Sequence, residues 1–187
     1  GAYIDFPDAK ILSCSPEEFV NLYNKRVRIR PIKGTSPVGD NAEEIHSNTQ
    51  RLISSDKERA ENLMIVDLIR NDLGKICKIG SIRVPNMFQV EQHPSVLHLV
   101  STIEGDLLES ASPVDLLKAC FPCGSVTGAP KLRSMEIIEE LEPVRRNAYC
   151  GAIGYISFDG DMCTSIAIRM LTRSEERRVG KECRSRW

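Results

Sequence analysis

The amino-acid sequence predicts a mixed fold of strands and helices, the α+β class, from three local patterns. Residues 3–6 and 10–13 lie on either side of a Pro-Asp pair and have the pattern of two strands joined as a hairpin. An Asp-Gly-Asp run at 159–161 separates two apolar stretches and indicates a second hairpin. Residues 42–73 instead follow a helical pattern. We therefore expect strand pairs near both ends of the chain and a long helical segment between them.

Length and composition place the chain among globular proteins. It has 187 residues, 41% of them hydrophobic, and a net charge of -1. This allows one domain, or a large piece of one, with a sizeable core. The balanced charge gives no reason to expect a nucleic-acid or membrane partner. No apolar run is long enough to span a bilayer, and the first residues alternate like a strand and show no secretory signal.

Cysteine usage points to a reducing compartment. The seven cysteines are scattered through apolar segments, so we expect packed, reduced thiols in an intracellular protein, cytoplasmic or, in a eukaryote, plastid. Cys120 and Cys123 have the spacing of a redox pair or of half a zinc site. No second Cys or His pair accompanies them at zinc-site spacing, so a redox or zinc module remains an alternative without further support.

Residues 15–18 predict the start of a short helix. Ser15 is a good N-cap, Pro16 fits the first turn, and Glu18 stands where a capping-box carboxylate belongs. This assignment leaves Glu17 without a capping role. On local grounds Glu17 is a first-turn acid that the helix dipole favours.

Lys33 is the first candidate for chemistry. Residues 26–32, in which apolar and basic side chains alternate, predict a half-buried strand that turns at Gly34. Lys33 then lies at the end of a rigid element that aims its amine into a cleft. Such an amine acts as a nucleophile when its surroundings leave part of it unprotonated. The alternative is a surface lysine beside a turn.

The helical segment is expected to divide into two helices near residues 54–56 and to stop at Gly74. Residues 63–66 are apolar almost all round, which favours a helix buried between layers. Glu58 and Glu61 share one face of this helix. Asp67 and Asn71 share another face. Magnesium takes one or two protein carboxylates together with waters and substrate oxygens, so the carboxylates of this helix are candidate ligands. The alternative is an ordinary helix with salt bridges.

Two further strands are expected at 81–84 and 96–103, and an amphipathic helix at 113–121. His98 alternates into the second strand, where a lone histidine is more often a hydrogen-bonded core residue than a catalyst.

A loop of small residues, 124–131, runs into a predicted helix over 131–141. Because small residues let a ligand approach the backbone and a helix start supplies unpaired N–H donors, the loop is a candidate cradle for a carboxylate or phosphate. It lacks the spacing of a P-loop. Arg169 lies in the apolar strand expected at 164–169, so we expect it to meet an acid or an anionic ligand.

Six stretches are specific enough to compare with known enzymes. They are SPE (15–17), PIKGT (31–35), KERAENLMIVDLIRNDLG (57–74), GSVTGAPK (124–131), YCGA (149–152) and IAIR (166–169). In this order they resemble the chorismate-utilising enzymes, and the agreement extends from Ala2 to about Thr172. The family includes component I of anthranilate synthase and of aminodeoxychorismate synthase, and the isochorismate and salicylate synthases. Lys33 resembles the aminodeoxychorismate branch, because the anthranilate-forming members have alanine there.

The resemblance implies a two-layer α+β fold of antiparallel sheets with helices packed outside. It also implies an amino-group transfer that converts chorismate to 4-amino-4-deoxychorismate, towards para-aminobenzoate and folate. Ammonia would come from a glutamine amidotransferase partner, with magnesium as cofactor. The roles carried over are nucleophile for Lys33, general acid/base for Glu17, magnesium ligand for Glu61, substrate carboxylate binding for Gly34, Thr35, Tyr149 and Arg169, and pocket lining for Ser125 and His98.

Two departures from the family pattern define the expected domain. Residues 1–172 correspond to the C-terminal catalytic domain without its final strand, its Gly-Ala-Gly turn and the last helix, which carries a second magnesium-binding glutamate. The family's N-terminal half is missing as well. Residues 173–187 are charged and lack apolar periodicity, so we expect a disordered or artefactual tail. Anthranilate synthase and an inactive docking subunit remain alternative functions.

Overall fold

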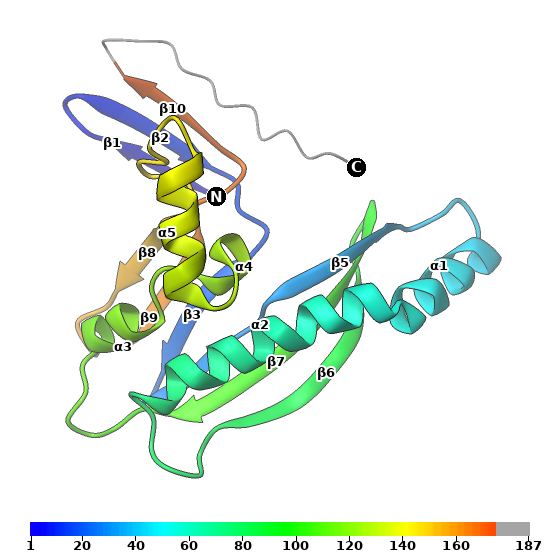
Figure 1. The fold of residues 1–187 in the computed structure, drawn as a ribbon, viewed down its shortest axis with the longest axis horizontal. Helices are drawn as coiled ribbons and strands as arrows, with labels where there is room; N and C mark the ends of the chain where they lie inside the picture. The colour runs from blue at the N-terminus through cyan, green and yellow to red at the C-terminus, as the bar shows by residue number, and fades with distance from the viewer. Residues whose placement is uncertain (175–187) are drawn as a thin grey trace.

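Two antiparallel sheets, of three and seven strands, and five helices make up residues 1–174, which are the residues that the computed structural model describes. The helices lie on the outside of the sheets (Figure 1). The predicted α+β class is therefore confirmed. The elements in chain order are β1 (Ala2–Asp5), β2 (Ala9–Ser13), β3 (Glu18–Tyr23), β4 (Arg26–Ile29), β5 (Ile32–Pro37), α1 (Ala42–Ser54), α2 (Asp56–Gly74), β6 (Arg83–Gln92), β7 (Val96–Asp106), α3 (Pro113–Cys120), α4 (Gly124–Thr127), α5 (Lys131–Leu141), β8 (Ala152–Ile156), β9 (Met162–Ile166) and β10 (Met170–Ser174).

The larger sheet is organised around β7, the longest strand of the described residues. One edge of β7 pairs with β6, and the other pairs with β4 and then with β5. β4 and β5 follow one path along β7, interrupted at Pro31, whose carbonyl accepts a hydrogen bond of 3.3 Å from the Ser101 N–H. Beyond β4 the sheet continues through β3 and β9 to β8. The smaller sheet has the order β1-β2-β10, and both predicted hairpins are present.

The larger sheet divides where β4 ends. β3 pairs with β4 only through Asn21–Tyr23, and its first residue, Glu18, pairs with β9. The chain beyond β4 continues as β5 along β7, so β3 and β5 diverge. Figure 1 shows the result: β5, β6 and β7 extend to one side together with α1 and α2, and β8 and β9 lie with α3 to α5 on the other. We call the place where β3 and β5 separate the sheet fork, and it consists of residues 17–18 and 31–33.

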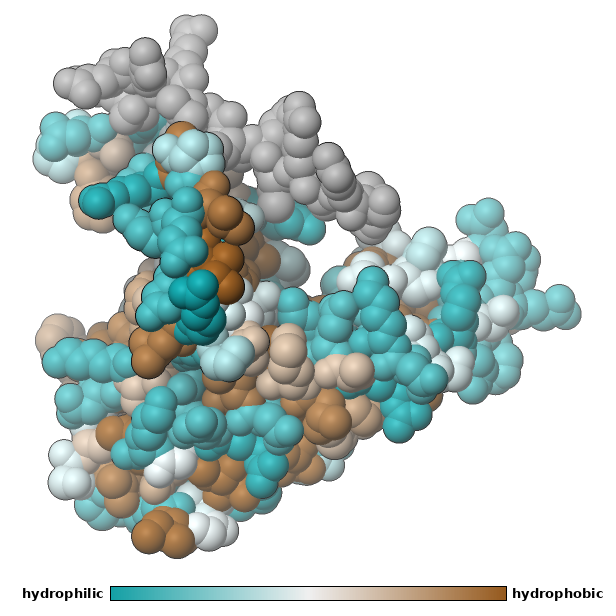
Figure 2. All heavy atoms as spheres, viewed as in Figure 1, coloured by the Kyte–Doolittle hydropathy of each residue, from teal (hydrophilic) through white to brown (hydrophobic). Residues whose placement is uncertain are grey.

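Helix α2 packs one of its faces against the sheet. Ile65, Val66, Ile69 and Leu73 are buried there, in one cluster with side chains of β3, β4 and β7. The other face is open, since Leu63 and Met64 are 43% and 42% exposed, and Figure 2 shows hydrophobic and hydrophilic residues mixed over it. The prediction of a helix buried between layers is therefore wrong, because α2 has one exposed face. No helix among residues 1–174 is long and apolar enough to cross a membrane.

A buried polar network fixes α2 on β7. Asn62 is fully buried; its Nδ2 donates to the Leu99 carbonyl at 3.4 Å, and its Oδ1 accepts from the Ser101 hydroxyl at 2.6 Å. The Ser101 hydroxyl in turn accepts from the Phe88 N–H of β6 at 3.1 Å. Because buried polar groups are costly unless paired, this network specifies one register of α2 over the sheet.

The short helix predicted at residues 15–18 is not formed. Residues 15 and 16 have no regular secondary structure, residue 17 forms a bend, and the Ser15 hydroxyl accepts from the Glu17 N–H at 3.2 Å instead of capping a helix. The Glu17 carbonyl accepts a bond of 3.1 Å from Ile166 N–H of β9. Pairing with a strand that lies far along the sequence therefore outweighs the local capping signal.

The structure also differs from the prediction at Lys33 and at Arg169. Lys33 lies inside β5, because the strand passes through Gly34 with an irregular register and no turn. Arg169 lies between β9 and β10, with φ of 51°, and its carbonyl accepts from the Cys14 N–H at 3.1 Å. The expectation that Arg169 stands inside an apolar strand is therefore wrong.

The predicted tail at 173–187 begins within β10, which runs to Ser174 and pairs with β2. The remainder of that tail lies outside the described residues, so the proposed domain boundary stays a prediction.

Candidate active site

Lys33, Glu17 and Ser125 meet at the sheet fork. The Lys33 Nζ donates a hydrogen bond of 2.9 Å to the backbone carbonyl of Ser125. The Oε1 of Glu17 accepts from the Ile32 N–H at 3.5 Å, which places the carboxylate beside the residue that precedes the lysine. The Ser125 side chain lies close enough to Glu17 to lower the pKa of its carboxyl group. An amine and a buried carboxyl group therefore share one location.

The fold delivers Glu17 to this location through a bulge in β3. The register between β3 and β9 shifts between Glu18 and Asn21, and Thr164 of β9 fills the irregularity. Its hydroxyl donates to the Val20 carbonyl at 2.7 Å and accepts from the Val20 N–H at 3.0 Å. β-bulges bend a strand and re-aim its side chains, which here turns the start of β3 away from β5 and leaves room for the Glu17 side chain.

Burial sets the protonation of Glu17. The residue is only 8% exposed, and this desolvation raises the pKa of its carboxyl group. The Ser125 side chain, the Ile32 N–H and the charge of Lys33 oppose the rise without cancelling it. A carboxyl group with a raised pKa keeps its proton to higher pH, which is the property that a general acid needs.

Ser125 is presented by α4, a single helical turn where the sequence predicts a loop. Gly124 packs directly on α2: a Cβ at this position would lie 2.4 Å from Leu68. The Cys123 Sγ lies 3.3 Å from the Ser125 Oγ, and the Thr127 hydroxyl donates to the Cys123 carbonyl at 2.9 Å. The turn is therefore held against the helix that covers the sheet fork.

Gly34, Thr35 and His98 adjoin the lysine. Gly34 has φ of 91°, and a Cβ there would lie 3.1 Å from the Glu58 Oε2 and 3.2 Å from Leu52. The Thr35 Oγ1 lies 3.2 Å from the His98 Nδ1 across the β5–β7 pairing. Burial, and then the neighbouring His93, lower the pKa of His98, so its imidazole is neutral at pH 7. A hydroxyl and a neutral imidazole are groups that hydrogen-bond a polar ligand.

Tyr149 and Arg169 belong to two adjoining segments. The Cys150 N–H donates to the Ala167 carbonyl at 2.9 Å, and the Ala167 N–H donates to the Gly151 carbonyl at 2.8 Å. Tyr149 lines a cavity of about 620 Å³ between α5 and residues 142–151, and the Arg169 side chain is exposed. The structure thus brings these two predicted carboxylate-binding residues into one region, and their role stays a prediction.

Glu61 lies on the open face of α2. Its side chain is 44% exposed and its Oε1 is 4.0 Å from the Lys57 ammonium. Glu58, three residues earlier, points towards the sheet instead, where it stands against Gly34 and so reaches the neighbourhood of Lys33. Two carboxylates one helical turn apart suit magnesium, which completes its shell with waters and substrate oxygens. Among residues 1–174 no group of three or more His, Cys, Asp or Glu side chains is arranged to hold a metal by itself.

The cysteine alternative finds no chemical support. Cys120 and Cys123 are buried free thiols. Burial raises the pKa of the Cys120 thiol to about 12, and it also raises the pKa of Cys123. Reactive cysteines have lowered pKa values and accessible sulfur atoms, so these two thiols have the character of inert core residues.

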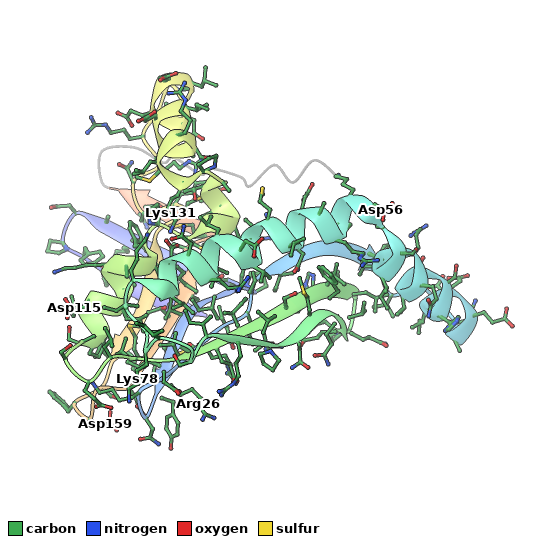
Figure 3. The ribbon with its side chains drawn as sticks, turned by 60° about the horizontal axis from the view of Figure 1, so that its bottom comes forward. Arg26, Asp56, Lys78, Asp115, Lys131 and Asp159 are labelled. Carbon is green, nitrogen blue, oxygen red and sulfur yellow. The ribbon has the colours of Figure 1, made fainter. Side chains whose placement is uncertain are left out.

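Sequence reasoning did not identify the role of Lys131, which Figure 3 labels at the junction of α5 with α2. Lys131 is largely buried and pairs with the buried Asp72 at the end of α2. A lysine that follows a proline at a helix start carries no signal of burial. Only the three-dimensional arrangement shows that this charge lies inside the protein.

Solved structures share this fold. The chain superposes on anthranilate synthase component I from Streptococcus pneumoniae with a TM-score of 0.84 and 42% identity, covering 94% of this chain and 38% of that one. It superposes on the menaquinone-specific isochorismate synthase from Escherichia coli with a TM-score of 0.79 and 25% identity, covering 90% and 38%. The arrangement is therefore the chorismate-binding fold of these synthases, present as part of a domain.

The sequence comparison gives the family. The sequence model described as chorismate binding enzyme matches residues 1–181, and the chain belongs to this family. Aminodeoxychorismate synthase component 1 from Salmonella typhimurium is 54% identical over 174 residues, which are 93% of this chain. Anthranilate synthase component 1 from Aquifex aeolicus is 50% identical over 167 residues, or 89% of it. The chain spans only 38% and 34% of the lengths of these two relatives.

Proposed function

We propose that the chain is the part of an aminodeoxychorismate synthase that converts chorismate and ammonia into 4-amino-4-deoxychorismate and water. The observation that carries the proposal is the meeting of Lys33 and the buried Glu17 at the sheet fork. An amine supplies a nucleophile and a protonated carboxyl group supplies a general acid, and hydroxide is a poor leaving group without such an acid.

The reaction is a double displacement at the chorismate ring. The Lys33 nitrogen forms a bond to the ring, and the ring hydroxyl departs as water with the proton of Glu17. Ammonia then bonds to the ring and the lysine nitrogen leaves, so the net change is the replacement of a hydroxyl by an amino group. Lys33 first has to release the Ser125 carbonyl and lose a proton, because an ammonium ion has no free electron pair.

The two carboxylates of chorismate require two anchoring groups. The Thr35 hydroxyl and the backbone beside Gly34 lie next to Lys33, and Tyr149 with Arg169 supplies a second polar region. Glu61 and Glu58 would hold magnesium, which binds and neutralises a substrate carboxylate. Rigid anchoring at two points keeps the ring in position for attack, which is a large part of the rate gain in such reactions.

The name component 1, which the relatives carry, supports a second component as partner. For this chain we propose a glutamine amidotransferase that supplies the ammonia, and a cytoplasmic location. Whether that partner is fused or separate does not affect the chemistry at Lys33.

A second candidate is the formation of anthranilate, and the 50% identity to the Aquifex aeolicus anthranilate synthase component favours it. The two functions differ in product, because anthranilate formation also removes the side chain of chorismate. Lys33 favours the first function, since the anthranilate-forming enzymes that the chain resembles have alanine there.

The test is a chorismate titration in the presence of magnesium, followed by product analysis with ammonium as nitrogen donor, on the full-length protein that carries this chain. Lys33→Ala is compared with Lys118→Ala, a change of an exposed lysine in the last turn of α3. We expect 4-amino-4-deoxychorismate from the parent and the control, and none from Lys33→Ala. Absence of chorismate binding by the parent would instead identify a docking subunit.

A further inference from the structure

A buried ion pair joins the end of α2 to the start of α5. Asp72 and Lys131 have side chains that are 7% and 14% exposed, and the Lys131 Nζ contacts the Asp72 Oδ2. Lys75 also reaches Asp72, at 3.1 Å, but its side chain is 61% exposed. Losing one partner of a buried pair is costly because the other charge is left in a poorly solvated place. Lys131 is therefore fixed on α2.

The ammonium group of Lys131 also joins the two ends of the segment between residues 120 and 131. Lys131 Nζ donates a second hydrogen bond, of 2.8 Å, to the carbonyl of Cys120, the last residue of α3. Residues 120 and 131 are the two ends of the segment that contains α4. Its ends are thus tied to each other and, through Asp72, to α2.

This segment carries the contact to Lys33. Within it the Gly128 N–H donates to the Gly124 carbonyl at 2.9 Å, which closes the turn that presents Ser125. The Ser125 carbonyl accepts the hydrogen bond from Lys33, and the Ser125 side chain influences the pKa of Glu17. A displacement of the segment would therefore remove the acceptor of Lys33 and change the surroundings of Glu17.

We infer that Lys131 is a positioning residue for Lys33: through its bonds to Asp72 and to the Cys120 carbonyl it holds α4 where the Ser125 carbonyl receives the amine. This role rests on the proposed function for its catalytic meaning, but the geometry itself is testable without substrate. Lys131 touches neither Lys33 nor Glu17 in the described contacts, so its effect is transmitted by the segment between residues 120 and 131.

The chain offers a matched control. Lys75→Met removes the same charge from the same carboxylate as Lys131→Met, but Lys75 makes no described contact with the segment that carries α4. A purely electrostatic effect on Asp72 would appear in both variants, and it would be smaller in Lys75→Met because solvent screens the exposed charge of Lys75. A positioning effect would appear only in Lys131→Met.

The first measurement is the acylation rate of each lysine by acetic anhydride, followed by peptide mass spectrometry on the chain and both variants. If the two bonds of Lys131 are lost, α4 moves and Lys33 loses its hydrogen-bond acceptor. We therefore expect the labelling of Lys33, relative to that of Lys118, to rise about fivefold in Lys131→Met and to stay unchanged in Lys75→Met. Equal Lys33 labelling in all three proteins would overturn the inference, whatever the activity.

A variant that unfolds would label every lysine faster, and its melting curve would show it. Asp72→Asn then decides, because it keeps the shape of the pair and removes the charge that strengthens it. A rise in Lys33 labelling above about twofold supports the positioning role, and no rise rejects it.

The second measurement is turnover by the full-length protein with chorismate and ammonium. We expect kcat to fall about 10- to 100-fold in Lys131→Met with little change in KM, because misplacement of a reacting group affects the chemical step. If Lys33 labelling rises in Lys131→Met but the parent shows no turnover, the positioning role of Lys131 is retained and the proposed function is rejected. If Lys33 labelling is unchanged in Lys131→Met and the parent turns over normally, the positioning role is rejected and the proposed function is retained.

Discussion

The Nζ of Lys33 and the carbonyl oxygen of Ser125 lie 2.9 Å apart, although 92 positions separate the two residues in the sequence. The contact crosses from β5 to α4 at the place where the larger sheet divides. Replacing the amine tests whether it serves chemistry or structure. Lys33→Gln should leave the melting temperature of the chain within about 2 °C of the parent, since the residue is only part-buried and loses one hydrogen bond.

In the full-length protein the same change should abolish normal product formation. Calorimetry measures the first effect and product chromatography the second. Unfolding of Lys33→Gln, or undiminished turnover, would contradict the proposed role, and Lys118→Gln provides the comparison for the loss of an exposed lysine.

Glu17 makes the stability depend on pH. Its pKa is raised by burial, so the folded protein holds this proton more tightly than the unfolded chain does. The stabilisation from this proton is present below the unfolded value of 4.5, and it is lost as the pH rises from there through the folded pKa. Glu17→Gln should remove that decline. Denaturant unfolding across this range, with Glu18→Gln as control, measures it, and parallel curves for parent and Glu17→Gln would be inconsistent with burial of the acid.

Activity should respond to Glu17→Gln as well. An amide cannot give up a proton to the departing hydroxyl, so we expect kcat to fall by about 100- to 10,000-fold. The amide oxygen can still accept from the Ile32 N–H, which keeps the geometry of the sheet fork. Loss of activity together with loss of chorismate binding would point to a binding role instead.

Magnesium binding provides a third test. Glu61→Gln should raise the magnesium concentration needed for half-maximal chorismate binding by at least about tenfold, as expected when a metal site loses a partner. Asp67→Asn is the matched control, because Asp67 lies on the same helix and pairs with Arg70 at 3.1 Å. Titration calorimetry at several magnesium concentrations separates the two variants. An unchanged magnesium requirement in Glu61→Gln would assign this residue to the surface ion pair with Lys57.

The Asn62–Ser101 hydrogen bond should account for part of the stability of α2 on the sheet. Asn62→Ala and Ser101→Ala each leave a buried partner unsatisfied, so each should lower the free energy of unfolding by about 1 to 3 kcal/mol. The double variant should cost less than the sum, because the two residues share one bond. Urea unfolding of the four proteins gives the coupling energy, and strict additivity would show that the network adds nothing beyond its members.

Elements that depend on neighbouring residues were predictable from the sequence, and those that depend on distant pairing were not. The two hairpins, the break before α2 and the helices α3 and α5 follow from local turn, cap and periodicity signals. The segment at Glu17 has equally good local signals for a helix, but its backbone pairs with β9 instead. Lys33 was expected at a turn because Gly34 suggests one, whereas pairing with β7 keeps the strand going.

The candidate site shows the same division. The identity of Lys33, Glu17 and Ser125 as a group came from resemblance to a family, because nothing in the spacing of residues 17, 33 and 125 indicates that they meet. The bulge at Val20, the buried Asn62 and the Asp72–Lys131 pair carried no local signal at all. They are contacts between elements, and only the fold reveals them.

The backbone at Gly34 limits how this region can vary. Its φ of 91° is unfavourable by about 1 to 2 kcal/mol for any residue with a side chain, and a Cβ there would lie 3.1 Å from Glu58 and 3.2 Å from Leu52, so that these side chains would have to shift slightly. In a library of all single substitutions screened for folding alone, position 34 should therefore tolerate fewer replacements than the exposed Thr35 beside it. The strand conformation that positions Lys33, the proposed nucleophile, therefore depends on the glycine that follows it in the chain.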